Sequence, residues 1–281
     1  MDNDDTAPMQ SALAVRALLP TFRAAISSDS APGFRVLRSF PRGDDEPKTN
    51  SSNDGKTVCV LDSSFNPPTK AHMHLALRAL RHYTTPTQTP SLLLLLATAN
   101  ADKKAVPAAP EQRVAMMCLL ADELRSNAAT VDNRPACHVD VGVTTSARFI
   151  DKCADLQTNG YAGSRLVWIM GFDTLIRLLD TKYYPPEHTL APVHDTLLAG
   201  SNRILAFGRP GDTFGDTVTQ QAYYSAVDGK VAERLDVLEA DESTAGISSS
   251  AVRGAVARGE AVDGGVCESI AAFIRTEGLY L

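Results

Sequence analysis

Short apolar segments alternate with helical segments along most of this 281-residue chain, and this alternation limits the possible folds more than any other feature. The apolar runs are short enough for buried strands, and the segments between them carry apolar residues at helical spacing. Strands that alternate with helices form right-handed βαβ units and a parallel sheet covered on both faces. We therefore predict an α/β fold, a Rossmann-like doubly wound parallel sheet of five to six strands.

The sequence also predicts where these elements lie and how the chain is divided. Strands are expected over 57–62, 91–97, 137–143, 165–170, 202–208 and 234–240. Helices are expected over 69–83, 110–124, 145–156, 248–258 and 266–276, and one more begins near Asp173. Helical spacing over 10–28 is interrupted by Pro20, and the polar stretch 41–56 is typical of a linker. We predict an N-terminal helical extension with its linker over 1–56 and a main domain over 57–281.

Composition excludes several classes of protein. With 44% apolar residues and a net charge of −6, the chain is not disordered, and its mild acidity argues against binding to duplex nucleic acid. No apolar run is long enough to cross a membrane, and Asp2, Asp4 and Asp5 replace the basic start of a secretory signal. The five cysteines form no CxxC pair, which predicts reduced, buried thiols. We expect a cytoplasmic protein, with the nucleus as a second compartment.

Three motifs suggest chemistry that their context does not support. Gly55-Lys56-Thr57 resembles the end of a phosphate-binding P-loop, but Asn50 replaces the first glycine and a strand follows. Neither GxGxxG after a strand nor GxSxG occurs. His72 and His74 lie two residues apart on a predicted helix and therefore do not face each other. We predict no protein-held metal.

The segment 61–75 directly follows the first main-domain strand and is a candidate anion site. Pro67 and Pro68 end the strand, and Thr69 is a candidate N-cap of the next helix. His72 then lies in the first turn, beside unpaired backbone N–H groups at the positive end of the helix dipole. A histidine there can donate to a phosphate oxygen. Alternatively, a nearby carboxylate satisfies the ring, and the histidine is structural.

A second candidate anion site lies over 246–260. Ser248, Ser249 and Ser250 open a helix, and Arg253 lies four residues beyond Ser249 on the same face. The alternative is a serine cap beside a solvated arginine. Lys103 and Lys104 follow the second strand on a loop, where a lysine pair is either part of the same anion site or a solvated surface.

These segments resemble the motifs of nucleotidylyltransferases, and of the nicotinamide-mononucleotide adenylyltransferase family in particular. SFNPPTKAH is similar to the (G)SFxPxTxxH signature, and ISSSAVR is similar to ISSTxxR. Four further segments match in the family's order: KK…QRVAMMCLLA, GFDTLIRLL, FGRPG and the tail VCESIAAFIRTEGLYL. The resemblance covers roughly residues 57–281.

The resemblance implies roles for individual residues. It implies that transfer depends on four basic side chains: His72, Lys103, Lys104 and Arg253. It implies that ATP contacts Ser63, Ser64, Phe65, Thr69, His72, Gly171, Asp173, Arg209, Ser248, Ser249 and Arg253. It implies an acceptor pocket at Asn66, Tyr183 and Tyr184, and Mg²⁺ that is carried on the ATP phosphates rather than by a protein cage.

The implied activity is transfer of AMP from ATP to a pyridine mononucleotide, in its amide or acid form, to give NAD or deamido-NAD and pyrophosphate. Two departures from the family pattern stand out: Ser63 replaces a glycine, and the single tryptophan, Trp168, lies within a predicted strand. Two other functions therefore stay open. One is a cytidylyltransferase acting on another phosphorylated acceptor, and the other is a regulatory nucleotide-binding protein that hydrolyses ATP weakly. The sequence leaves a homo-oligomer open and predicts neither nucleic-acid nor membrane partners.

Overall fold

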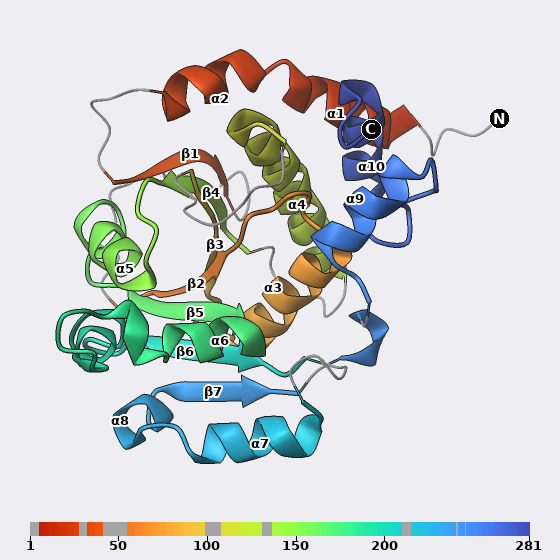
Figure 1. The fold of residues 1–281 in the computed structure, drawn as a ribbon. Coiled ribbons are helices and arrows are strands. Elements are labelled where there is room, and N and C mark those ends of the chain that lie inside the picture. The colour runs from red at the N-terminus through yellow and green to blue at the C-terminus, as the bar shows by residue number, and fades with distance from the viewer. Residues whose placement is uncertain are drawn as a thin grey trace.

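The protein folds around one seven-stranded sheet, shown in a computed structural model that describes residues 6–27, 33–41, 55–98, 108–130, 137–209, 215–239, 241–244 and 246–281, without the side chains of 127–130 (Figure 1). Its strands are β1 (Phe34–Phe40), β2 (Thr57–Asp62), β3 (Ser91–Ala97), β4 (Val139–Thr144), β5 (Arg165–Gly171), β6 (Arg203–Phe207) and β7 (Leu235–Leu238). They are ordered β1-β4-β3-β2-β5-β6-β7, and only β1 runs antiparallel to its neighbour.

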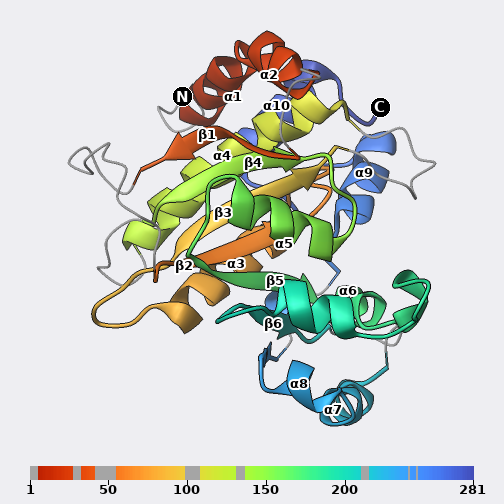
Figure 2. The same ribbon diagram turned by 90° about the vertical axis from the view of Figure 1, so that its left-hand side faces the viewer.

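Helices cover both faces of this sheet. One face carries α1 (Thr6–Arg16), α2 (Leu19–Ile26), α3 (Lys70–Tyr83), α4 (Pro110–Thr130), α9 (Ser249–Ala257) and α10 (Glu268–Glu277). The opposite face, nearer the viewer in Figure 2, carries α5 (Phe149–Thr158), α6 (Phe172–Leu178) and the short turns η1 (Thr181–Tyr183) and η2 (Val193–Leu197). The helices α7 (Thr217–Ser225) and α8 (Gly229–Ala232) lie beside β7 at one end of the sheet, and η4 (Glu242–Thr244) precedes α9.

The leucine run of β3 shows why the sheet needs helices on both sides. Leu92, Leu94 and Leu96 belong to the core beneath α3 and α4, whereas Leu93 and Leu95 belong to the core beneath α5 and α6. Successive side chains of a strand point to opposite faces, so a continuous apolar run requires cover on both.

The direction of the chain reverses between β2 and β5. From β2 the chain moves outward through β3 and β4, then returns to β5 on the other side of β2 and continues through β6 and β7. Ligands of doubly wound sheets bind beyond the carboxyl ends of the strands at such a reversal. The segments that follow β2 and β5 are therefore where a site is expected.

The doubly wound parallel sheet is confirmed, and one strand was missed. The sequence predicted five to six strands, but residues 34–40 form the edge strand β1. The register shifts between Val36 and Arg38, which breaks the regular alternation by which a strand is recognised. The helix predicted over 145–156 begins later, at Phe149, and the helical segment 10–28 forms two helices, with Pro20 in the first turn of α2.

The N-terminal segment packs into the same core as the rest of the described chain. Ala12, Val15, Phe22 and Phe40 join the core formed by α3, α4 and α10. Ion pairs accompany this packing: Arg16 contacts Glu277 of α10 at 2.6 Å, and Arg23 contacts Glu111 of α4 at 2.7 Å. The predicted extension over 1–56 is therefore not packed separately where it is described. Most of the predicted linker 41–56 lies outside the described residues.

Two further expectations concern the cysteines and membrane spans. All five cysteines are free and buried, as the sequence predicted. In the part of the chain that the structure describes, no helix combines the length and the apolar character that a bilayer crossing requires.

Candidate active site

The turn after β2 is held in an unusual backbone conformation. Phe65 has a φ of 44°, which is rare for a bulky side chain and costs roughly 1–3 kcal/mol. Its ring is fully buried and packs 5.2 Å from the ring of His72. The next residue, Asn66, is also buried. Burial of these two side chains fixes the course of the turn and offsets the strain.

His72 occupies the third position of α3, where its ring takes part in capping the helix. Nδ1 accepts a hydrogen bond of 3.0 Å from the backbone N–H of Thr69, so in the neutral ring Nε2 carries the proton. Nε2 lies 2.9 Å from the hydroxyl oxygen of Ser63 and donates to it. Burial lowers the pKa of His72 to about 4. The ring is therefore neutral near pH 7 and presents an N–H group toward the end of β2.

The second predicted anion segment lies directly against the first. Ser248 caps α9, and its hydroxyl accepts from the N–H of Ala251 at 3.1 Å. Ser249 donates to the carbonyl of Pro67 at 2.8 Å, and Arg253 donates to the carbonyl of Asn66 at 2.6 Å. Two segments more than 180 residues apart are thus joined by side-chain hydrogen bonds to the turn after β2.

Two residues without a predicted role also hold this turn. Tyr280 donates to Oδ1 of Asn66 at 2.9 Å, and the same oxygen accepts from the N–H of Ala108 at 3.1 Å. Arg113 of α4 is buried and donates to the carbonyl of Ser64 at 3.3 Å. Both residues lie in segments that carry the family resemblance, the QRV run and the tail. Their role could not be deduced from these segments alone, since the contacts depend on the folded turn.

The predicted ribose-contacting residues lie at the end of β5. Gly171 is the N-cap of α6, and a Cβ on it would lie 2.9 Å from Oδ1 of Asp173. That carboxylate pairs with Arg209, which follows β6, at 2.8 Å and with Arg177 at 3.2 Å. The backbone N–H of Arg209 donates to Gln220 of α7 at 3.0 Å. Gly171, Asp173 and Arg209 thus lie together on the other side of the chain reversal from His72.

The two predicted tyrosines are not brought together with these groups. Lys103 and Lys104 lie outside the described residues. Tyr183 is 46% exposed on η1, under the ammonium of Lys182. Tyr184 is a core residue whose hydroxyl donates to the carbonyl of Leu178 at 2.6 Å. Its ring is therefore not available for stacking on an acceptor, which corrects that prediction. Trp168 is completely buried, in agreement with a core role.

A buried ion pair that sequence reasoning missed lies at the end of β2. Nζ of Lys152, on α5, contacts Oδ2 of Asp62 at 2.5 Å, and the side chains are 5% and 8% exposed. Burial raises the pKa of the Asp62 carboxyl, and the positive charge of Lys152 opposes that rise. Asp62 directly precedes Ser63, so this pair borders the site on the sheet face opposite to α3.

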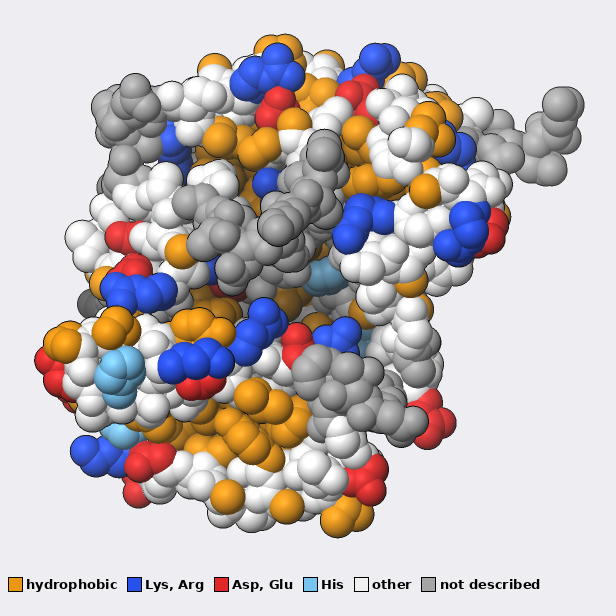
Figure 3. Space-filling view, in the orientation of Figure 1, with side chains coloured by type: hydrophobic (Ala, Val, Ile, Leu, Met, Phe, Trp, Pro, Cys, Tyr) orange, Lys and Arg blue, Asp and Glu red, His pale blue; other side chains and the backbone are white. Residues whose placement is uncertain are grey.

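Positive charge gathers around this edge of the sheet. Figure 3 shows a histidine and several Lys and Arg side chains in the middle of the face, between α9 and α6. Such a surface favours an anionic ligand. Among the described residues, no group of three or more His, Cys, Asp or Glu side chains is arranged to hold a metal ion.

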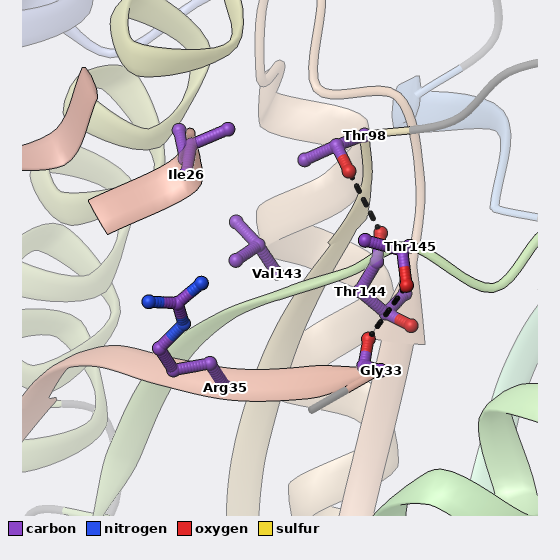
Figure 4. Close-up of a pocket in the computed structure, with 7 residues that line it drawn as sticks. All are labelled: Ile26, Gly33, Arg35, Thr98, Val143, Thr144 and Thr145. Atoms are coloured by element: carbon purple, nitrogen blue, oxygen red, sulfur yellow. Dashed lines mark hydrogen bonds between the residues drawn. The ribbon is translucent and has the colours of Figure 1, made fainter. Parts of the chain in front are cut away.

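A separate small pocket lies where β1 joins the sheet (Figure 4). Seven residues line it: Ile26, Gly33, Arg35, Thr98, Val143, Thr144 and Thr145. Two of its threonine hydroxyls donate to backbone carbonyls, with Thr98 contacting Thr144 at 3.2 Å and Thr145 contacting Gly33 at 3.5 Å. The hydroxyl of Thr144 accepts from the N–H of Ser146 at 3.0 Å. The first two bonds tie the edge strand to the ends of β3 and β4, and we assign the pocket no ligand.

Comparison with known proteins decides the family. The family model described as cytidylyltransferase-like matches residues 60–255, which include the turn after β2, the end of β5 and most of α9. The chain belongs to this family. The matched range contains His72 and Arg253 but leaves α10 and Tyr280 outside.

Individual relatives bear related names. A Schizosaccharomyces pombe protein named "Putative nicotinamide mononucleotide adenylyltransferase" is 38% identical over 169 residues, which are 60% of this chain and 59% of that protein. Two structures of the Plasmodium falciparum nicotinic acid mononucleotide adenylyltransferase also match, each over 80% of this chain and 97% of theirs. The complex with NaAD has a TM-score of 0.55 at 14% identity, and the complex with APC has 0.52 at 12%. These structures share the fold with this chain.

Proposed function

We propose that the protein is an adenylyltransferase that joins the AMP part of ATP to a pyridine mononucleotide and releases pyrophosphate. One observation carries the proposal: the turn after β2, the first turn of α3 and the start of α9 form one hydrogen-bonded unit at the chain reversal. Its polar groups include Nε2–H of His72, the hydroxyl of Ser249 and the guanidinium of Arg253. These groups suit the phosphates of a nucleotide. The name of the S. pombe relative supports the choice of acceptor.

The chemistry requires positioning and charge neutralisation more than proton transfer. The 5′-phosphate of the acceptor is already ionised near pH 7, so it can attack the α-phosphorus of ATP without a general base. A new P–O bond forms as the bond to the β-phosphate oxygen breaks, and pyrophosphate leaves with the electron pair. Donors aimed at the phosphates stabilise the charge that develops on this leaving group.

Each proposed residue has a part in this step. His72 donates from Nε2 to a phosphate oxygen, and Thr69 orients its ring. Arg253, with Ser248 and Ser249, binds the β- and γ-phosphates, and we propose the same role for Lys103 and Lys104, which lie outside the described residues. Ser63, Ser64 and Phe65 form the turn beside the triphosphate, and Asn66 borders the acceptor. Gly171, Asp173 and Arg209 contact the nucleoside. ATP is proposed to enter as its Mg²⁺ complex, with the ion carried on the phosphates.

We further propose that residues 57–281 carry the catalytic groups and that the segment before them stabilises the sheet edge through β1. Tyr183 stays a candidate for acceptor stacking, because its ring is partly exposed. The proposed compartments are the cytoplasm and the nucleus, and the proposed partners are ATP and the mononucleotide.

A second function is favoured by one specific observation. Because Ser63 stands where the family signature has glycine and already contacts Nε2 of His72, the site is also compatible with a nucleotide-binding protein that hydrolyses ATP without an acceptor. A third option, transfer of a cytidylyl group to another phosphorylated acceptor, shares the same phosphate-binding residues.

A product assay separates these functions. The purified protein is incubated with Mg²⁺, nicotinamide mononucleotide and either ATP or CTP, and the products are identified by mass spectrometry. The proposal predicts NAD and an equal amount of pyrophosphate with ATP, and little product with CTP. ADP and inorganic phosphate that form at the same rate without the mononucleotide would identify the hydrolase, and a CTP-dependent product would identify the cytidylyltransferase.

A further inference from the structure

The buried pair of Asp62 and Lys152 requires an explanation that stability does not supply. Removing two charges from water costs several kcal/mol per ion, and two apolar side chains of similar size often stabilise a core at least as well. Nζ of Lys152 lies 2.5 Å from Oδ2 of Asp62, and both side chains are less than a tenth exposed. Stability alone therefore does not account for the pair.

The position of the pair fits the acceptor side of the proposed site. Asp62 is the last residue of β2 and points toward α5, whereas the following Ser63 contacts His72 on α3. The phosphate-binding groups and the ion pair therefore border the same strand end from opposite faces of the sheet. This end lies beside the chain reversal between β2 and β5, where the ligand is expected.

An aromatic surface adjoins the ion pair. Nζ of Lys152 lies 5.1 Å from the ring centroid of Phe149, a half-buried residue in the first turn of α5. The edge of this ring is fixed against Trp168, with centroids 5.5 Å apart and planes at 82°. A partly exposed, rigid aromatic ring next to two opposite charges suits a flat heterocycle that carries a polar substituent.

We propose that Asp62 and Lys152 select the amide form of the pyridine mononucleotide over the acid form. This inference rests on the proposed function and specifies its substrate. A carboxamide matches both charges, since its NH₂ group donates to the Asp62 carboxylate and its carbonyl accepts from the Lys152 ammonium. A carboxylate in the same place also accepts from Lys152 but meets the negative charge of Asp62. Like charges at close range disfavour binding, so the acid form is rejected.

The test compares the two acceptors with wild-type protein and two variants. Asp62→Asn removes the repelling charge and keeps the shape and an acceptor oxygen for Lys152. Asp151→Asn is the matched control, because it removes one negative charge from the exposed side of α5, the helix that carries Lys152. There Asp151 pairs with Arg148 at 2.8 Å. For each protein, kcat/KM is measured with nicotinamide mononucleotide and with nicotinic acid mononucleotide, and ATP binding is measured separately.

The proposal predicts that wild-type protein prefers the amide by at least about tenfold and that Asp151→Asn keeps this preference. Asp62→Asn should reduce the ratio by about tenfold or reverse it, mainly through a lower KM for the acid. Equal use of both acceptors by wild-type protein, or preference for the acid, would overturn the proposal even if Asp62→Asn does not fold. An unchanged ratio in folded Asp62→Asn would also overturn it. Loss of both products in wild-type protein that still binds ATP would instead refute the proposed function, and the inference with it.

Discussion

The hydroxyl oxygen of Ser63 lies 2.9 Å from Nε2 of His72, so the proposed phosphate-binding histidine already donates within the protein. A phosphate oxygen must displace this hydroxyl or share the N–H group with it. The glycine of the family signature would leave Nε2 unengaged by a neighbouring side chain. We therefore expect Ser63 to lower the affinity for ATP.

Replacing Ser63 tests this competition. We expect Ser63→Gly to lower the KM for ATP about three- to tenfold, because the N–H group of His72 no longer exchanges one partner for another. Ser63→Ala removes only the hydroxyl and keeps a Cβ that restrains the backbone. It should therefore lower the KM for ATP by less than Ser63→Gly does. Steady-state kinetics with varied ATP measure both. A higher KM in both variants would mean that the serine hydroxyl itself binds ATP.

His72 has a structural and a proposed catalytic part, and two substitutions separate them. His72→Ala should lower kcat by about 10²–10³ and reduce stability by about 1 kcal/mol, since the N–H of Thr69 loses its acceptor. His72→Gln places the usual capping-box side chain at the same position of α3, so it should recover stability without recovering activity. Urea unfolding and product formation are measured on each variant. If His72→Gln recovers activity together with stability, and His72→Ala loses both in proportion, the role of His72 is purely structural.

The lowered pKa of His72 predicts how the stability of the free protein depends on pH. Its folded-state pKa of about 4 lies below the usual histidine value of 6.5, so between these values the unfolded chain binds the proton more readily. The stabilisation from the neutral ring is therefore complete above pH 6.5 and is lost as the pH falls toward 4, by roughly 3 kcal/mol at most. Urea unfolding from pH 7 to pH 4 should show a steeper loss in wild-type protein than in His72→Gln. An equal loss of stability in the two proteins between pH 7 and pH 4 would contradict the lowered pKa of His72.

Arg253 is expected to act on ATP rather than on folding alone. Arg253→Gln should raise the KM for ATP by about tenfold or more, because one charged donor to the phosphates is lost. Arg258 is the control, since it follows the last residue of the same helix, is exposed, and pairs with the nearby Glu260 at 2.6 Å. Arg258→Gln should leave the kinetics unchanged. Equal KM values for wild-type protein and Arg253→Gln would remove Arg253 from the site.

Tyr280 links the end of the chain to the turn after β2. Tyr280→Phe removes the hydrogen bond to Oδ1 of Asn66, which should cost about 0.5–1.5 kcal/mol and reduce kcat/KM several-fold as the turn loosens. Removal of Leu281, which is 92% exposed, changes the same end of the chain without this bond and should have no effect. Thermal unfolding and kinetics are compared. Unchanged stability and kcat/KM in Tyr280→Phe would show that the hydrogen bond from the N–H of Ala108 to Oδ1 of Asn66 is enough to hold the turn.

The fold was largely predictable because its strands are short, continuous apolar runs. Leu92–Leu96 fill both cores from a single strand, and no other element explains such a run so simply. The edge strand β1 was missed for the opposite reason: it carries an exposed arginine, Arg38, and a register shift, so neither period is visible in FRVLRSF. Recognition of β1 requires knowledge of its partner β4.

In the candidate site, a residue's place within its own helix or strand could be predicted from the sequence, whereas its contacts across the fold could not. The sequence predicts that His72 lies in the first turn of a helix, and the structure places it at the third position of α3. The contact of Arg253 with Asn66 and that of Lys152 with Asp62 connect distant segments, and no local pattern contains them. Tyr184 was misplaced because sequence offset from β5 does not indicate which way the chain turns after α6.

The most direct measurement follows the phosphorus atoms of ATP. Protein is incubated with nicotinamide mononucleotide and either α-³²P- or γ-³²P-labelled ATP, and the labelled products are separated. The proposed adenylyl transfer predicts the α label in the dinucleotide and the γ label in pyrophosphate, with both dependent on the mononucleotide. The α label in ADP and the γ label in inorganic phosphate, at a rate unaffected by the mononucleotide, would contradict it.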